Sequence, residues 1–468
     1  MERPLDCLNN LAQDDWLIGY NSHQFNKIAQ ELYLELTELS ACGTPPKIIL
    51  AEREPLRFLA SFIAACAANC PVFLCNPDWG TQEWQQVFDL VQPDIILGIG
   101  HGALVLSVAE VWGMGNGNNT QCPIPNSIMI PTGGSSGQIK FVIHTWKTLI
   151  ASVKGFTEYF QLKQVNSFCV LPLYHVSGLM QFMRSFTTGG KLAILPFKAL
   201  ETGQILNIKQ PEFFISLVPT QLQRLLENPE LTEWLHQFNT VLLGGAPAWN
   251  ELLEKARFHR IRLAPTYGMT ETASQVATLK PDEFLSGKIS SGQILPHAKV
   301  TIRNQQGEIL NSNQIGNITI HAQSLALGYY PRTRENQDIF QVDDLGFLDE
   351  QNHLNIVGRS SDKIITGGEN IYPAEIESAI QATQMVADIC VIGIPDKHWG
   401  QVLTAIYIPK QSNTSALKIQ TLLKEKLSKF KIPKYWIPQQ NLPRNSQGKI
   451  NHQQLQQIAI EFLQNPIT

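Results

Sequence analysis

Residues 131–140 combine glycines, hydroxyl side chains and a lysine in the order Pro-Thr-Gly-Gly-Ser-Ser-Gly-Gln-Ile-Lys. They follow the apolar segment Ile128–Ile130, which has the character of a strand. Glycines let backbone N–H groups turn toward an anion, while hydroxyls and a lysine add donors and positive charge. The segment predicts a phosphate-binding loop, although it lacks the G-x-x-x-x-G-K-[ST] spacing of the P-loop, and a plain surface turn is the alternative. The candidate ligands are Thr132, Gly133, Gly134, Ser135, Ser136, Gly137 and Lys140.

Residues 266–275 form a second motif, Thr-Tyr-Gly-Met-Thr-Glu-Thr-Ala-Ser-Gln. The ring of Tyr267 could stack on a planar group, and Gly268 would let a ligand approach the backbone closely. Thr270 could donate to a phosphate, and Glu271 could hold Mg²⁺ as a hard oxygen ligand. The alternative is the start of a helix capped by Thr270 and Thr272.

A third motif joins residues 343–347 (DDLGF) to Gly358-Arg359. The carboxylate of Asp344 could accept hydrogen bonds from both hydroxyls of a ribose, and Arg359 offers a fork of donors to the same sugar or to a phosphate. The alternative is a charged turn between two strands.

Two further motifs lie near the C-terminus. Residues 362–375 contain Gly367 and Gly368, which permit close approach of the backbone to a ligand or, alternatively, form a tight loop before a helix that starts at Pro373. Residues 443–450 (PRNSQGKI) place Lys449 after a glycine in a polar segment, as expected of a mobile catalytic cation. A solvated lysine is the alternative there.

The elements that must position these motifs are short apolar segments that alternate with helical stretches. This alternation predicts a mostly parallel, doubly wound α/β sheet. The expected strands are Lys47–Ala51, Pro71–Cys75, Asp94–Gly98, Phe168–Leu171, Lys191–Leu195, Phe213–Leu217 and Thr240–Leu243, with helices such as Thr81–Val91, Trp146–Phe160 and Pro219–Leu226 between them.

The pattern changes twice further along the chain. From about Gly292, alternating apolar and polar residues in Lys299–Arg303 and Gly316–Ala322 predict an antiparallel β-subdomain over about residues 292–358. After Arg359, helix Ala374–Gln381, strands Asp388–Ile394 and Leu403–Ile408, and helix Ser415–Leu427 predict a small α+β module. We therefore expect a large body over residues 1–359 and a mobile C-terminal domain over residues 360–468, hinged near Ser360.

Composition narrows the class of protein. Of the 468 residues, 43% are hydrophobic and 16% are charged, which excludes a disordered chain, a coiled coil and a collagen-like repeat. The net charge of −4 argues against a general nucleic-acid binder. That charge divides into −7 for residues 1–359 and +3 for the remainder, and residues 410–449 hold nine basic residues and one acidic residue. The C-terminal domain is thus expected to meet an anionic ligand.

The sequence also favours a cytoplasmic protein that is not integral to a membrane. The N-terminus has no signal-peptide pattern, and the eight cysteines form no Cys-x-x-Cys pair or zinc-site spacing, as expected of reduced thiols. Phe58–Pro77 lacks charge over 20 residues, but Asn69 and Pro71 interrupt it. We interpret it as a buried helix, Leu56–Ala68, followed by a buried strand, Val72–Cys75.

Taken in order, the five motifs resemble those of the acyl-adenylate-forming (AMP-binding) ligase superfamily, from about Leu56 to Leu455. Further segments are similar to its o-succinylbenzoate–CoA ligase branch, which acts in menaquinone or phylloquinone biosynthesis. These are residues 171–180 (LPLYHVSGLM), 183–185 (MRS), 218–226 (VPTQLQRLL), 242–247 (LLGGAP) and 267–275 (YGMTETASQ).

The resemblance implies a two-step reaction with ATP, Mg²⁺ and coenzyme A. A carboxylate attacks the α-phosphate of ATP, and the thiol of coenzyme A then displaces AMP. Negative charge gathers around one phosphorus in the first step, so oriented donors and cations matter more than a base. The resemblance implies that the 132–140 loop binds the β- and γ-phosphates and that Thr270 binds the α-phosphate, while Glu271 holds Mg²⁺ and Lys449 lies between the α-phosphate and the attacking carboxylate. It also implies that Asp344 and Arg359 bind ribose. Adenine would lie among Gly244, Gly245, Ala246 and Tyr267, and Gly268 and Met269 would also line the cofactor site.

After rotation of the C-terminal domain, Gly367 and Gly368 are expected beside the pantetheine of coenzyme A. In the acyl pocket we expect His175, which is also a candidate catalytic group, together with Gly268, Thr272 and Ser274. Arg184 is the candidate for the second carboxylate of the substrate, because an unpaired buried charge is costly; an ion pair with a neighbouring acid is its alternative. Ile139 and Phe141 depart from the family pattern around Lys140 and are expected to stiffen the loop.

Several functions remain open on the sequence alone. Another aryl- or medium-chain acid–CoA ligase is the nearest, and an adenylation enzyme that loads a carrier protein is the next, although no carrier domain follows Thr468. A nucleotide-sensing relative without activity is the third. The expected partners are small molecules, and the protein is expected to be a monomer or homodimer.

Overall fold

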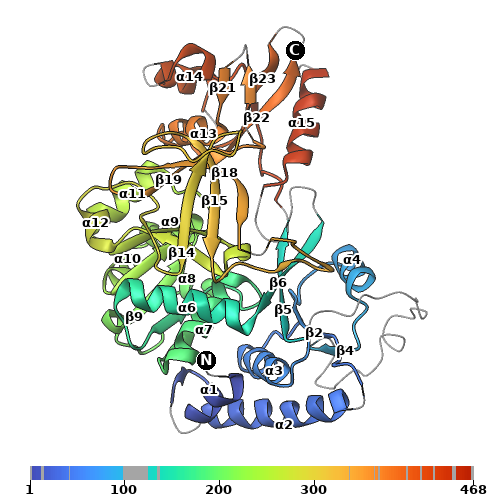
Figure 1. Ribbon diagram of the computed structural model, residues 1–468. Helices are drawn as coiled ribbons and strands as arrows, with labels where there is room; N and C mark the ends of the chain where they lie inside the picture. Colours follow the sequence, from blue (N-terminus) through green and yellow to red (C-terminus); the bar gives the residue numbers. More distant parts are fainter. Residues whose placement is uncertain are drawn as a thin grey trace.

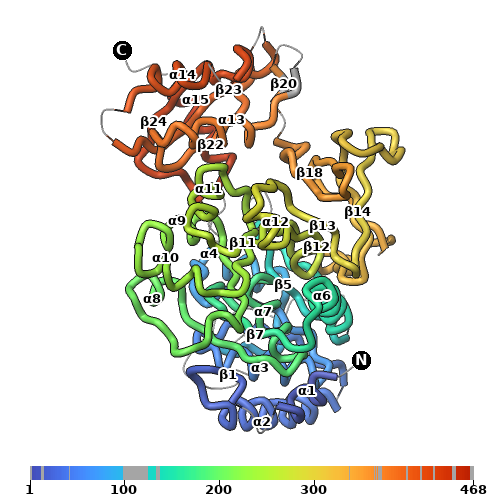
Figure 2. The backbone as a smooth tube through the Cα atoms, turned by 90° about the vertical axis from the view of Figure 1, so that its left-hand side faces the viewer, coloured from blue at the N-terminus to red at the C-terminus, as the bar shows by residue number. Residues whose placement is uncertain are grey.

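The structure is a computed structural model, and the residues that it describes form four β-sheets. In Figures 1 and 2 the C-terminal segment, coloured orange to red, lies at the top of the view, and the other three sheets with their helices lie below it. The described residues are 3–11, 15–41, 43–98, 125–133, 138–336, 338–362, 364–366, 369–396, 399–411, 414–424, 427–444 and 450–464.

The largest sheet has eight strands and carries the second motif. Neighbouring strands are parallel from β1 to β11, and β12 and β13 then add two antiparallel strands at one edge. The order is β1 (Leu17–Ile18), β8 (Leu192–Ile194), β7 (Asn166–Cys169), β9 (Phe213–Leu217), β10 (Thr240–Leu243), β11 (Leu263–Met269), β12 (Ser274–Thr278) and β13 (Gln293–Ile294). Its helices are α6 (Trp146–Phe160), α7 (Val176–Thr188), α8 (Phe197–Glu201), α9 (Pro219–Glu227), α10 (Pro229–His236), α11 (Asn250–Phe258) and α12 (Pro281–Leu285).

The second sheet has seven strands and carries the first motif. Strands β4, β2, β3 and β5 are parallel, whereas β5 and β6 form an antiparallel hairpin to which β16 and β17 are added. Its members are β4 (Ile95–Leu97), β2 (Ile48–Leu50), β3 (Val72–Leu74), β5 (Ser127–Gly133), β6 (Ile139–Thr145), β16 (Gly328–Tyr329) and β17 (Arg332–Thr333), with helices α1 (Pro4–Asn10), α2 (Ser22–Ala41), α3 (Pro55–Ala67) and α4 (Thr81–Val91) nearby.

The uncharged segment at residues 58–77 is core, as expected. Helix α3 buries ten of its side chains and β3 buries all three, because such α/β elements are covered on both faces. None of the helices within the described ranges is long and apolar enough to cross a membrane. The cysteines found free of disulfides in those ranges, Cys7, Cys66, Cys70, Cys75, Cys169 and Cys390, are all buried, while Cys42 and Cys122 lie outside the described residues.

The third sheet is the predicted antiparallel β-subdomain. Its strands follow the order β14 (Ala298–Arg303), β15 (Gly316–Ala322), β18 (Phe340–Leu348) and β19 (Leu354–Arg359). Asp343 and Asp344 lie within β18, so the alternative of a charged turn for the third motif is wrong. Asp344 pairs directly with Arg359 across the two strands.

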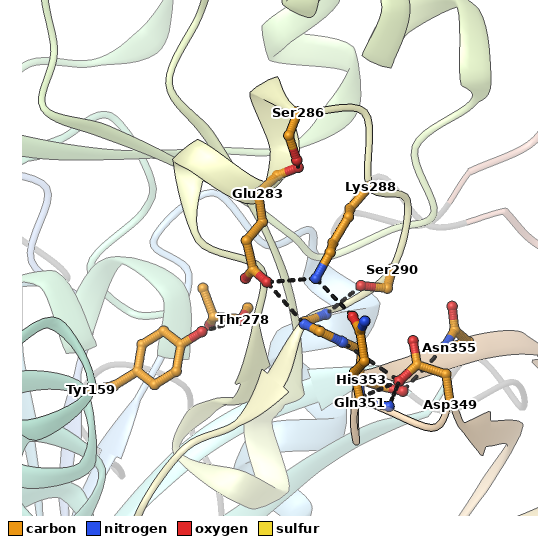
Figure 3. Close-up of polar contacts among 11 residues, drawn as sticks. Tyr159, Thr278, Glu283, Ser286, Lys288, Ser290, Asp349, Gln351, His353 and Asn355 are labelled. Carbon is orange, nitrogen blue, oxygen red and sulfur yellow. Dashed lines mark hydrogen bonds and ion pairs between the residues drawn. The ribbon is translucent and has the colours of Figure 1, made fainter. Parts of the chain in front are cut away.

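A polar cluster around the buried His353 connects this β-subdomain to α12 beside the main sheet (Figure 3). Glu283, on α12, accepts hydrogen bonds from Lys288 at 2.9 Å and contacts Nε2 of His353 at 3.2 Å. Burial acts to raise the pKa of Glu283, but Lys288 and His353 together lower it below its ordinary value. The same lysine donates to Gln351 at 2.9 Å, and Asp349 accepts from the backbone of His353. The cluster lies outside all five motifs, and its contacts fix the position of β18 and β19.

The C-terminal segment forms its own sheet and core, as the α+β prediction required. The residues Ile376, Ile380, Val391, Leu403 and Ile419 share one apolar cluster. Its elements are β20 (Ile364–Thr366), β21 (Glu369–Ile371), α13 (Pro373–Gln381), β22 (Val386–Asp396), β23 (Gly400–Pro409), α14 (Ala416–Lys424), β24 (Tyr435–Pro438) and α15 (His452–Gln464).

Candidate active site

The first motif is the stem of the β5–β6 hairpin. Thr132 pairs with Lys140, and Gly133 pairs with Ile139. The exposed Lys140 places its ammonium nitrogen 5.9 Å from the centroid of the Tyr329 ring on β16. The tip of the hairpin, Gly134, Ser135, Ser136 and Gly137, lies outside the described residues.

Phe141 follows Lys140 but points to the opposite face of β6, because side chains alternate along a strand. It is fully buried, and its ring meets Phe73 edge-on with centroids 5.2 Å apart. Its bulk therefore fills the core of the second sheet. The expectation that Ile139 and Phe141 stiffen the loop stays a prediction, because residues 134–137 lie outside the described residues.

Glu271 lies in a single 3-10 turn, Thr270–Thr272, between β11 and β12. One carboxylate oxygen, Oε1, accepts a 2.6 Å hydrogen bond from the hydroxyl of Tyr329. Burial and the charge of Glu271 raise the pKa of Tyr329, so this hydroxyl is a donor at neutral pH. Through Tyr329, the structure brings Glu271 of the second motif close to Lys140 of the first.

The turn is not the start of a longer helix, so the helix-cap alternative is wrong. Ala273 and Ser274 follow it with φ angles of +51° and +96°, in the left-handed region that non-glycine residues rarely occupy. Thr272 is fully buried, and its hydroxyl bonds the carbonyls of Met269 at 3.0 Å and Ser274 at 2.5 Å. That hydroxyl stabilises the turn itself. Gly268 is required nearby, since a Cβ there would lie 2.1 Å from the carbonyl oxygen of Ser274.

Tyr267 connects the second motif to the third. Its hydroxyl donates to Oδ2 of Asp344 at 2.6 Å, and Oδ1 of the same carboxylate contacts Nε of Arg359 at 3.3 Å. Burial and the neighbouring Asp344 raise the pKa of Tyr267. The Asp344 side chain is 16% exposed and Arg359 is 58% exposed, so the carboxylate is sheltered while the guanidinium faces solvent.

The Gly244–Ala246 segment follows β10, whose neighbouring strand β11 carries Tyr267. Leu217 and Leu243 end β9 and β10 and are in register with Pro265 within β11, and ligands of open α/β sheets bind beyond the carboxyl ends of such strands. A Cβ on Gly244 would lie 2.6 Å from the Thr266 hydroxyl, so a larger residue there would displace that side chain. Gly245 and Ala246 are exposed, so their backbone is accessible to a planar ligand.

Arg184 is buried in α7 with no acidic partner among the residues the structure describes. One guanidinium nitrogen donates to Ser274 at 3.0 Å and to Gln275 at 3.1 Å, and the group stacks on the ring of Phe156 at 4.1 Å. Nε of Arg184 has no hydrogen-bond partner within those ranges. Burial lowers its pKa to about 9. Among the described residues, the ion-pair alternative for Arg184 therefore has no support.

His175 is the N-cap residue of the same helix. Its carbonyl accepts hydrogen bonds from Gly178 and Leu179, and its half-buried ring tilts against Tyr174 at 4.6 Å. Burial, reinforced by Asp78, raises the pKa of Tyr174 to about 12. Nine helical positions separate His175 from Arg184, which is about 13 Å along the axis and half a turn around it. The two side chains therefore leave α7 in different directions.

The remaining motif residues fall where the structure describes only the flanking strands. Thr366 pairs with Glu369 on either side of Gly367 and Gly368, and Arg444 bridges to Ile450 beside Lys449. Gly367, Gly368 and Lys449 themselves lie outside the described residues.

The expected hinge is held by Asp343. Its carbonyl accepts a 2.7 Å hydrogen bond from the backbone N–H of Ser360, and its carboxylate accepts from the backbone N–H of Ser361 at 3.2 Å and from the hydroxyl of that serine. A neutral serine pair thus engages the acid that lies next to Asp344.

Comparisons with known proteins agree with this arrangement. A family model described as AMP-binding enzyme matches residues 39–330, and one described as AMP-binding enzyme C-terminal domain matches residues 375–449. The chain belongs to the AMP-binding enzyme family. It is 34% identical to the 2-succinylbenzoate–CoA ligase of Bacillus anthracis over 347 residues, which cover 71% of this chain and 70% of the relative. It is also 34% identical to the Oceanobacillus iheyensis enzyme of that name, over 60% of this chain and 58% of the relative.

Several solved structures share the fold of this chain over nearly its whole length. The o-succinylbenzoate CoA synthetase of Bacillus subtilis in complex with its acyl-adenylate intermediate aligns with a TM-score of 0.81 at 26% identity, over 96% of this chain and 97% of that one. A double mutant of the Bacillus subtilis enzyme bound to a product analogue aligns over the same shares at 25% identity with a TM-score of 0.63. ATP-bound MatB of Rhodopseudomonas palustris, 21% identical over 97% of this chain and 98% of that one, shares the fold with a TM-score of 0.78.

Two residues of the site lie outside the motifs that the sequence singled out. Tyr329 bonds Glu271, and His144 contacts the carbonyl of Thr270 at 2.7 Å. Both lie on paired strands, β16 and β6, of the second sheet. No spacing marks them, because pairing between residues about 190 positions apart brings them together.

Proposed function

We propose that this chain is an ATP-dependent o-succinylbenzoate–CoA ligase of menaquinone or phylloquinone biosynthesis. It would form o-succinylbenzoyl-AMP with release of pyrophosphate, and would then transfer the acyl group to coenzyme A with release of AMP. The observation that carries the choice of substrate is Arg184, a buried guanidinium without an acidic partner in the described chain that lies beside the turn of the second motif.

The cost of a buried charge supports a second carboxylate on the substrate. A guanidinium removed from water is destabilising unless an anion or several acceptors compensate it. In the described chain Arg184 has two neutral acceptors and one aromatic face, while Nε makes no hydrogen bond. The ring carboxylate of o-succinylbenzoate would supply the missing negative charge, and the succinyl carboxylate would be the one that reacts. Ser274, Gly268 and His175 remain the other proposed contacts of the acyl group.

For the adenylation step we propose that oriented donors and cations do most of the work. Lys140 and the 132–137 loop would hold the β- and γ-phosphates, Thr270 would donate to the α-phosphate, and Lys449 would bridge it to the attacking carboxylate. Asp344 and Arg359 would bind ribose, with adenine between Tyr267 and Gly244–Ala246. These roles assign each charged motif residue to one part of the nucleotide.

Glu271 fits the proposed magnesium site. Mg²⁺ is usually held by one or two carboxylates together with substrate phosphates, and no described group of three His, Cys, Asp or Glu residues offers an all-protein cage. Tyr329 fixes Oε1 of Glu271, and no described residue donates to Oε2. When bound there, Mg²⁺ would neutralise charge on the phosphates during attack.

We also propose that the C-terminal domain rotates between the two steps. The TM-score of 0.81 to the acyl-adenylate complex, against 0.63 to the product-analogue complex over equal coverage, supports an arrangement suited to adenylation in this chain. Rotation about Ser360 and Ser361 would withdraw Lys449 and bring Gly367 and Gly368 to the pantetheine. Asp343 would release both serines during that motion.

The first test is ATP–pyrophosphate exchange with and without o-succinylbenzoate. Exchange that depends on this acid supports adenylation, and exchange with no acid tested would leave a nucleotide-sensing relative as the better account. We propose that the protein acts on small molecules in the cytoplasm as a monomer or homodimer, which the elution volume of the purified protein would test.

A further inference from the structure

The turn at residues 270–274 is held at three backbone carbonyls by groups from outside it. Nε2 of His144, on β6, lies 2.7 Å from the carbonyl oxygen of Thr270. The backbone N–H of Ala326 donates to the carbonyl of Glu271 at 2.8 Å, and the hydroxyl of Ser152, on α6, donates to that of Ala273 at 2.6 Å. The position of the turn is therefore set by three separate segments.

These contacts oppose backbone strain. Ala273 and Ser274 both have positive φ, and such residues persist only where the surroundings over-determine their conformation. Without its external partners, the turn would relax toward commoner angles, and the side chains of Thr270 and Glu271 would move with it.

Helix α6 fixes two of the three contacts. Thr148 and Ser152 are both buried and lie four residues apart, on one face of the helix. The Thr148 hydroxyl lies 3.0 Å from Nδ1 of His144, so both ring nitrogens are engaged. The carbonyl of Thr270 only accepts, so Nε2 carries the proton, and burial lowers the pKa of His144 to about 4, which keeps the ring neutral.

The same stretch of chain carries the phosphate loop. Strand β6 starts one residue before Lys140, passes through His144 and leads at once into α6 at Trp146. A continuous strand and helix, β6 and α6, thus connect two parts of the proposed site. One is the hairpin that would hold the β- and γ-phosphates, and the other is the turn that would hold the α-phosphate and Mg²⁺.

We propose that His144 and Ser152 are positioning residues for adenylation, which hold the strained turn of Thr270 and Glu271 in register with the β5–β6 hairpin. The proposal rests on the proposed function for the roles of Thr270 and Glu271. Neither residue touches substrate; each acts through a backbone carbonyl.

The test compares Ser152→Ala and His144→Leu with a matched control, Tyr159→Phe. Tyr159 lies on the same helix, and its buried hydroxyl donates to the Thr278 carbonyl at 2.6 Å, beyond the strained turn. We expect all three variants to have a lower melting temperature than the wild type. Only S152A and H144L should lower kcat of pyrophosphate exchange by about tenfold or more, with KM for the acid within about threefold of the wild-type value. The reason is that a small displacement of catalytic groups lowers the rate steeply. Calorimetric titration should show weaker binding of ATP with Mg²⁺ to these two variants alone.

His144→Gln provides the rescue, because its amide can still donate to Thr270. We expect H144Q to recover most of the activity and ATP binding that H144L loses. Equal loss in S152A and Y159F, with H144Q no better than H144L, would overturn the proposal and leave both residues structural. Exchange is measured with whichever acid the wild type accepts. If the wild type activates only monocarboxylic acids, the proposed function is contradicted, but the variants can still be compared by their exchange rates with those acids. If it accepts no acid, the variants are compared by their binding of ATP with Mg²⁺.

Discussion

The hydroxyl of Tyr267 donates a 2.6 Å hydrogen bond to Asp344 and so joins two motifs that lie 77 positions apart in the sequence. Asp344 also contacts Arg359 on the neighbouring strand. The sheltered carboxylate thus has a fixed orientation before any ligand binds. Such preorganisation reduces the ordering cost of binding.

Asp344→Asn should therefore weaken nucleotide binding. The amide nitrogen cannot accept a hydrogen bond, and bonds to charged groups contribute enough that the loss should raise KM for ATP by about tenfold or more. Initial rates of pyrophosphate exchange at varied ATP measure this. Glu350→Gln, which removes an exposed acid just beyond β18, is the control. Equal KM values for D344N and E350Q would contradict the ribose role.

Arg184→Leu should separate the two carboxylates of the substrate. We expect kcat/KM for o-succinylbenzoate to fall by about a hundredfold, because removal of the guanidinium leaves the ring carboxylate of the substrate buried without a charged partner. The loss for 4-oxo-4-phenylbutanoate, which lacks the ring carboxylate, should be far smaller. Arg184→Lys keeps the charge and should be intermediate. Equal losses on both acids would indicate a structural role for Arg184.

Glu377 predicts a pH dependence of stability in the C-terminal domain. Burial raises its pKa to about 7, although the backbone N–H of Val391 donates to it at 2.7 Å. The folded state therefore keeps a proton on Glu377 that the unfolded state loses near pH 4.5. The contribution of this proton to the free energy of unfolding is fully present at low pH and is lost as pH rises to about 7. At about 1.4 kcal/mol per pKa unit, the change amounts to a few kcal/mol.

Glu377→Gln should remove this dependence. Relative to the wild type, its melting temperature should rise more at pH 8 than at pH 5, as calorimetry would measure. Glu375→Gln, which changes a surface carboxylate bonded to Lys431, is the control and should show no such difference between the two pH values. Parallel melting curves for E377Q and wild type would contradict a buried, protonated Glu377.

The basic residues of the C-terminal domain should act on ligand binding in a salt-sensitive way. Three of them form ion pairs with acids of the same domain, Lys431 with Glu375, Lys434 with Asp396 and Arg444 with Asp388. Lys424 and Lys429 form no ion pair with a described acid, and Lys426 lies outside the described residues. Replacing these three lysines by glutamine should raise KM for ATP or coenzyme A at low salt and much less at high salt. Unchanged KM values at low salt would contradict this role of the three lysines in attracting ATP or coenzyme A.

Local periodicity predicted most elements of the fold. Helices Thr81–Val91 and Trp146–Phe160 and strands Phe213–Leu217, Thr240–Leu243 and Gly316–Ala322 have the expected bounds, since each is an apolar or alternating segment closed by clear boundary residues. The antiparallel β6 was not predicted. In the sequence it follows a segment rich in glycine and serine, and its pairing with β5 and β16 depends on tertiary contacts rather than on its own pattern.

The sequence likewise predicted the residue types of the candidate site but not the tertiary contacts among them. The motifs predicted Tyr267, Glu271, Asp344 and Arg359, because each side chain type suits one part of a nucleotide. They could not predict that Tyr267 bonds Asp344 or that His144 and Ser152 support the turn. Those relations depend on sheet register and helix position, which no short spacing encodes.

The central claim is most directly tested by thioester formation with coenzyme A. Purified protein with ATP and Mg²⁺ would be assayed with o-succinylbenzoate, benzoate and octanoate, and kcat/KM would be compared among the three acids. We expect o-succinylbenzoyl-CoA to form with at least about a hundredfold preference, since a site with a buried charged group rejects acids that leave it unpaired. Faster thioester formation from octanoate or benzoate would contradict the assignment.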